Sequence, residues 1–137
     1  MISDAVNLAS RIEGLTKEYG SRILIGENTY RNLKSPEAYR IRYMDSVKVK
    51  GKVDVTAVYE VYDADLPEMR ELKDKIKKPF EEACRHFQAH RFTEAKKIFE
   101  ECLRVFPGDK AAISYVARAE DFEKHGVDEN WNVKKNK

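Results

Sequence analysis

Hydrophobic residues at the start of the chain recur every three or four positions. The members of this series are Ala5, Leu8, Ala9, Ile12, Leu15 and Tyr19. Such spacing places them along one face of a helix. Asp4 is suited to capping the first turn, and Gly20 is suited to ending the helix. The pattern therefore predicts an amphipathic helix from about Asp4 to Gly20.

The next forty residues have the pattern of a small sheet. A short strand is expected over 22–26, and a short helix over 27–34, ended by Ser35 and Pro36. Residues 38–49 and 53–62 have the composition of two extended strands, joined by a turn at Gly51. The order helix, strand, helix, strand, strand is typical of an α+β layer, in which the helices cover one face of the sheet.

The second half of the chain has a purely helical pattern. A charged connector over 64–79 is expected to close or kink at Pro79, and three amphipathic helices follow it. Their apolar faces are formed by Phe80, Ala83, Cys84 and Phe87, then by Ala95, Ile98, Phe99, Cys102, Leu103 and Phe106, and last by Ala112, Tyr115, Val116, Ala119 and Phe122. Pro107 and Gly108 end the second helix, and Asp109 is placed to cap the third.

The stretch RFTEAKKIFEECLRVFPGDKAA resembles part of a tetratricopeptide repeat. Ala95, Phe99, Cys102 and Pro107 occupy the small, aromatic, small and proline positions of that repeat. Only about one and a half units are present, so these helices are expected to pack on something else. The predicted organisation is a first domain over 1–63, the connector over 64–79, tetratricopeptide-like helices over 80–126, and a tail over 127–137.

Composition excludes several classes of protein. The 137 residues are 42% hydrophobic and 36% charged, as in a globular protein. The net charge of +2 indicates neither a nucleic-acid partner nor an anionic membrane, and no apolar run is long enough for membrane insertion. Cys84 and Cys102 are expected to be buried, reduced thiols in a cytoplasmic region.

Asn7 and Arg11 are the candidate chemical groups of the first helix. They lie four residues apart, on the flank of the predicted apolar face. An arginine there could present a planar fork of donors to phosphate oxygens, and an asparagine can both donate and accept hydrogen bonds. Spacing alone favours a solvated helix edge, so the geometry permits a phosphate site without establishing one.

Two motifs together resemble the C-terminal half of a class III adenylate/guanylate cyclase catalytic domain. They are SDAVNLASRIEGL and VKVKGKVDVTAVYEV, and the distance between them also fits. The resemblance covers residues 2 to about 62. It implies a partial ferredoxin-like cyclase sheet, and the helices after it resemble the tetratricopeptide-like extension of many bacterial cyclases. Domains of this family work as head-to-tail dimers, with each active site at the interface.

The resemblance implies roles for three residues. Asn7 would orient the ribose, and Arg11 would neutralise the charge that develops on the α-phosphate. Lys50 matches the lysine that binds the terminal phosphates. The adjacent Lys48 and Lys52 are interpreted as residues of a solvated strand edge.

The family also requires two metal-binding aspartates, to which no residue of this chain can be matched. They hold two divalent ions, magnesium or manganese, in the intact enzyme. We therefore expect the chain to be a fragment that by itself binds no metal and has no cyclase activity. The intact enzyme would convert ATP or GTP to cyclic nucleotide and pyrophosphate. The sequence leaves open whether the full-length protein has an upstream membrane or sensor domain.

The sequence is also compatible with a second class of function. The chain could be a non-catalytic interaction or dimerisation module, whose helical tail binds a protein partner. A homodimer is expected in either case, because half of a sheet leaves an unpaired strand edge. The expected partners are thus nucleotide, a second copy of the chain, and a protein at the tail.

Overall fold

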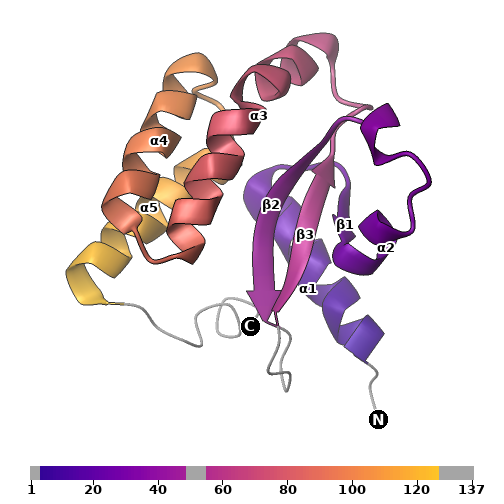
Figure 1. The fold of residues 1–137 in the computed structure, drawn as a ribbon, viewed down its shortest axis with the longest axis horizontal. Helices are drawn as coiled ribbons and strands as arrows, with labels where there is room; N and C mark the ends of the chain where they lie inside the picture. The colour runs from indigo at the N-terminus through magenta and orange to yellow at the C-terminus, as the bar shows by residue number, and fades with distance from the viewer. Residues whose placement is uncertain (1–3, 49–54, 127–137) are drawn as a thin grey trace. The chain divides into compact units, whose positions relative to one another are not determined.

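The computed structural model describes residues 4–48 and 55–126, with side chains from Ala9 onward. The chain divides into two compact units, and the division falls between Ala64 and Asp65. Figure 1 shows the elements of both units, coloured along the chain. Each unit has its own core, and each is described here by itself.

The first unit is mixed α/β and is compatible with the expected α+β class. Its elements are α1 (Asp4–Tyr19), β1 (Leu24–Gly26), α2 (Glu27–Arg31), the 3₁₀ turn η1 (Pro36–Ala38), β2 (Ile41–Lys48) and β3 (Val55–Val61). Their order is the predicted one, although β1, α2 and β2 are shorter than the sequence pattern indicates. The expected turn at Gly51 lies outside the described residues.

The described strands form an antiparallel sheet in the order β1-β3-β2. The predicted pairing of the two long strands is confirmed, with Arg42 opposite Glu60 and Val47 opposite Thr56. The register shifts between Tyr43 and Asp45, so the ladder contains a β-bulge at that point. A one-residue bulge exchanges the two faces of a strand, and this changes where every later side chain of β2 points.

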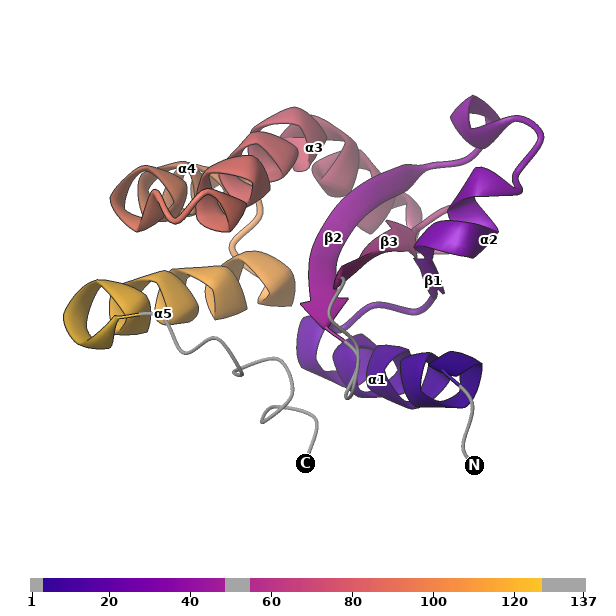
Figure 2. The same cartoon turned by 60° about the horizontal axis from the view of Figure 1, so that its bottom comes forward.

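Helices α1 and α2 contact opposite faces of this sheet. Tyr19 of α1 donates a hydrogen bond to Asp45, which is directly opposite Val58 on β3. Tyr30 of α2 stacks on Tyr59, with ring centroids 4.1 Å apart. Val58 and Tyr59 are neighbours in one strand, so their side chains point to opposite faces. The expectation that helices cover a single face is therefore wrong for α2, while α1 runs along the other face (Figure 2).

Helix α1 ends where the sequence pattern predicts. Gly20 has a φ of 64°, the left-handed conformation that glycine adopts without steric cost. The backbone N–H of Ser21 donates to the carbonyl of Thr16 over 3.1 Å, and this satisfies one carbonyl of the last turn. The sharp stop turns the chain back from the helix toward β1.

The second unit contains three helices: α3 (Pro67–Gln88), α4 (Phe92–Val105) and α5 (Lys110–His125). Helix α3 continues through Pro79, so the connector and the first tail helix are one element, and of the two expected outcomes, a close or a kink, the close at Pro79 is wrong. A proline inside a helix removes a hydrogen bond and crowds the preceding turn. Burial of Ile76 and Phe80 on either side of Pro79 offsets that cost by packing.

An aromatic cluster fills the core of the second unit. Phe99 and Tyr115 stack with centroids 4.6 Å apart, and Phe80 contacts both rings edge-on. The apolar faces predicted for these helices are thus confirmed, and Cys84 and Cys102 are buried free thiols. The finer similarity to a tetratricopeptide repeat stays a prediction. Within the described ranges, none of the helices is both long and apolar enough to span a bilayer.

Candidate functional site

Arg11 lies in the buried stripe of α1. Its side chain is 3% exposed, and it precedes Leu15 and Tyr19 by one and two turns. These two residues are 0% and 2% exposed, whereas Ala9, which the pattern placed on the apolar face, is exposed. The interpretation of Arg11 as a residue of a solvated helix edge is therefore wrong. Burial restricts a guanidinium to few positions, which is a requirement for electrostatic preorganisation.

The other two predicted site residues are placed only in part. Asn7 lies in α1, four residues before Arg11, and its side chain is not among those described. Lys50 lies outside the described residues, two positions beyond the end of β2 at Lys48. The structure therefore assigns two of the three candidates, Asn7 and Arg11, to one helix.

A buried hydrogen bond joins α1 to β2. The hydroxyl of Tyr19 donates to Oδ2 of Asp45 over 2.6 Å, and the two residues are 2% and 0% exposed. The other carboxylate oxygen, Oδ1, accepts the backbone N–H of Ser46 over 2.7 Å. Hydrogen bonds to a carboxylate are stronger than those between neutral groups, and burial strengthens them further. Asp45 therefore fixes both the end of α1 and its own strand.

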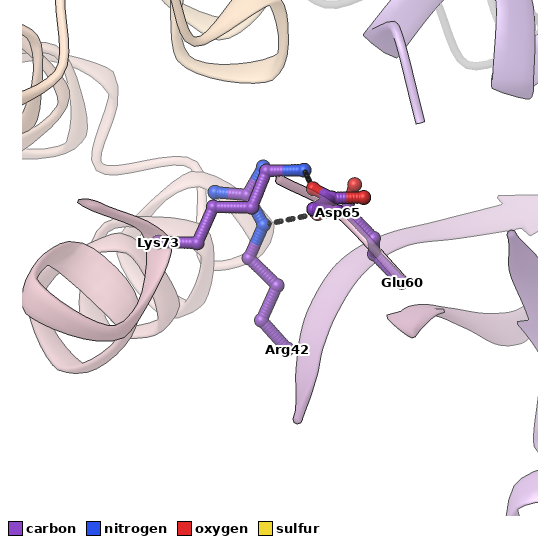
Figure 3. A network of polar contacts seen from close by, with 4 residues as sticks. All are labelled: Arg42, Glu60, Asp65 and Lys73. Atoms are coloured by element: carbon purple, nitrogen blue, oxygen red, sulfur yellow. Dashed lines mark hydrogen bonds and ion pairs between the residues drawn. The ribbon is translucent and has the colours of Figure 1, made fainter. Parts of the chain in front are cut away.

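A buried ion pair crosses the same sheet. Arg42 of β2 and Glu60 of β3 face each other, with 2.7 Å between Nε and Oε1 (Figure 3). Both side chains are 0% exposed. Two charges without contact to water are tolerated only when they are paired and hydrogen-bonded. The β2–β3 register therefore depends on both residues of this pair.

The second unit has a comparable buried pair at the start of α3. Nζ of Lys73 lies 2.5 Å from Oδ2 of Asp65, and the side chains are 5% and 7% exposed (Figure 3). Asp65 stands just before α3, and Lys73 lies in its second turn. This ion pair fixes the entry of the chain into the helical unit.

The described residues do not form a metal site. Across residues 4–48 and 55–126, no three His, Cys, Asp or Glu side chains converge in a way that could hold an ion. Asp45 and Glu60 are instead bonded to Tyr19 and Arg42. The two divalent ions that the resemblance implies for the intact enzyme stay a prediction.

Sequence reasoning missed Tyr19, Asp45, Arg42 and Glu60 as interacting groups. A signal was present, because charged residues are depleted from strand interiors and two of these are carboxylates within the predicted strands. The pattern could not pair them, since the bulge between Tyr43 and Asp45 determines which face Asp45 occupies.

The chain is similar to segments of known adenylate cyclases. It is 41% identical over 118 residues to "Adenylate cyclase, terminal-differentiation specific" of Dictyostelium discoideum, which covers 85% of this chain and 6% of that protein. It is 60% identical over 62 residues to the adenylate cyclase of Anabaena cylindrica, which covers 44% of this chain and 12% of that protein. Adenylate cyclase 1 of Rhizobium meliloti is 33% identical over 60 residues, or 44% of this chain and 9% of that protein.

These matches support an adenylate cyclase relationship for the chain. The chain spans only 6% to 12% of the length of these relatives. Neither a family model nor a solved structure matches it. The relationship therefore rests on these sequence matches.

Proposed function

We propose that this chain is the C-terminal part of a class III adenylate cyclase catalytic domain, followed by a tetratricopeptide-like helical segment. The observation that carries the proposal is the 60% identity over 62 residues to the Anabaena enzyme. The names of the three relatives favour ATP over GTP as the substrate of the complete enzyme. Intracellular signalling, a cytoplasmic location and a head-to-tail homodimer follow from the class III resemblance.

The proposed reaction forms a ring within one nucleotide. The ribose 3′ oxygen attacks the α-phosphorus, the bond from phosphorus to the bridging oxygen breaks, and pyrophosphate leaves as the hydroxyl loses its proton. Asn7 would hold the ribose, Arg11 would bind the charge that builds up on the α-phosphate, and Lys50 would bind the terminal phosphates. Divalent ions supply charge neutralisation in this chemistry, and we assign their ligands to a part of the enzyme outside the described residues.

A chimeric enzyme tests the proposal directly. The matching 62-residue segment of the Anabaena cyclase is replaced by that of this chain, and formation of cyclic AMP from ATP is measured with manganese. We expect the chimera to keep turnover within about tenfold of the Anabaena parent, because a correct segment restores the same positioned donors. The chain by itself serves as the control and is expected to be inactive.

A folded but inactive chimera would refute the catalytic proposal. It would favour the alternative in which this chain is a non-catalytic interaction or dimerisation module. Folding is checked by comparing the melting temperature and the dimer mass of the chimera with those of the parent. A chimera that is active with GTP in place of ATP would refute the assigned base.

Lys50→Ala in the chimera should raise the Michaelis constant for ATP more than it lowers turnover. The terminal phosphates are charged in the ground state as well as in the transition state, so their lysine contributes to both. Steady-state kinetics measure the two constants, and Lys34→Ala is a control on an exposed lysine of the same unit. An unchanged Michaelis constant would contradict the assignment of Lys50.

A further inference from the structure

We propose that the Tyr19–Asp45 hydrogen bond is a positioning device that holds α1, which carries Arg11, at a fixed separation from β2 during cyclisation. The inference rests on the proposed function, because that function places Arg11 on α1 and Lys50 just beyond β2. Neither Tyr19 nor Asp45 would touch the nucleotide. Both would act through the elements that carry the groups in contact with it.

The Tyr19–Asp45 hydrogen bond joins the two elements that the proposed function associates with phosphate ligands. Tyr19 is the last residue of α1, two turns after Arg11 on the same buried stripe. Asp45 is three residues before the end of β2 at Lys48 and five before Lys50. A direct contact of 2.6 Å therefore joins the helix of one proposed phosphate ligand to the strand that leads to the other.

The β-bulge is what brings Asp45 to α1. Arg42 is opposite Glu60, and Asp45 is opposite Val58, so Arg42 and Asp45 share a face although they are three residues apart. Regular alternation would have placed residues three apart on opposite faces. Bulges are over-represented beside active sites, where they redirect a side chain. Here the bulge directs a carboxylate toward the face contacted by Tyr19.

The bond also fixes β2 locally. Asp45 accepts Tyr19 at Oδ2 and the N–H of Ser46 at Oδ1, so one carboxylate orients the next peptide of the strand as well as the helix. Its 0% exposure keeps water from replacing either donor. Loss of the phenolic hydroxyl should therefore loosen β2 after the bulge and its attachment to α1.

The first test is Tyr19→Phe in the chimeric enzyme, which removes the hydroxyl and keeps the ring. We expect kcat to fall about tenfold to a hundredfold, since small misplacements of reacting groups cost that much, while KM stays within about threefold. Asp45→Leu should lower kcat similarly, and the double variant should lose no more than Asp45→Leu alone. Additive losses, or an unchanged kcat in Tyr19→Phe, would overturn the proposal.

Two controls separate positioning from stability. Tyr39→Phe makes the same chemical change at a tyrosine that is 49% exposed, and it should leave kcat unchanged. Ile41→Val removes one methyl group from the buried start of β2 and should lower stability without changing kcat. If Ile41→Val lowers kcat as much as Tyr19→Phe, the role of Tyr19 is only structural and the proposal fails.

Hydrogen exchange on the chain tests the coupling without activity. We expect Tyr19→Phe to speed exchange of the amides of Ser46, Val47 and Lys48 about tenfold relative to the parent, with Tyr39→Phe showing no change. Unchanged exchange at these amides would overturn the positioning role even if the chimera is inactive. An inactive parent chimera would refute the proposed function separately, since the exchange result does not depend on it.

Discussion

Glu60→Ala is expected to lower the free energy of unfolding of the first unit by about 3–5 kcal/mol, which is the usual cost of breaking a buried ion pair on one side. The substitution leaves the guanidinium of Arg42 in a site where both side chains are 0% exposed, with its partner at 2.7 Å removed. Chemical denaturation followed by circular dichroism measures the loss.

Two variants show whether the loss comes from the buried charge of Arg42 once Glu60 is removed. The double substitution Arg42→Met with Glu60→Leu removes both charges and fills similar volume, so it should be near neutral or stabilising. Arg31→Ala breaks the Glu27–Arg31 pair, in which Arg31 is 71% exposed, and should cost less than about 1 kcal/mol. A Glu60→Ala protein as stable as the parent would show that the pair does not support the sheet.

Elements governed by local periodicity could be predicted from the sequence. The apolar faces of α4 and α5 repeat with helical spacing, and Ala95, Phe99, Tyr115 and Ala119 are all fully buried as expected. The stop at Gly20 was equally local, because it depends on one residue with a positive φ. In these cases the stability of the local conformation depends on residues within one or two helical turns, so the sequence pattern is enough to predict it.

Features that depend on distant partners could not be predicted. The continuation of α3 through Pro79 depends on packing, whose stabilisation exceeds the local cost of a proline inside the helix. The position of Asp45 depends on a bulge, and its burial depends on a hydroxyl 26 residues earlier in the chain. A hydrophobicity pattern places charged residues in water, so it also misplaced Arg11, which needs a partner in three dimensions to be buried.

Burial of Arg11 changes how its role has to be tested. Arg11→Ala would remove a side chain that is 3% exposed, so a loss of activity could come from a lost core contact. Arg11→Lys is the sharper substitution, because it keeps the charge and the aliphatic stem but loses the planar fork of donors. Arg31→Lys makes the same change at a residue whose side chain is 71% exposed, and it should have no effect.

In the chimeric enzyme Arg11→Lys should lower turnover about a hundredfold to a thousandfold, the usual cost of losing one donor to transition-state charge. KM should change little, because the charge on the α-phosphate develops chiefly in the transition state. Turnover within a fewfold of the parent would assign Arg11 a purely structural role. A melting temperature that falls together with turnover would do the same, because the helix stripe would then have lost its packing. Lost turnover at an unchanged melting temperature is the result that the proposed role requires, since the loss of a purely structural residue would lower both together.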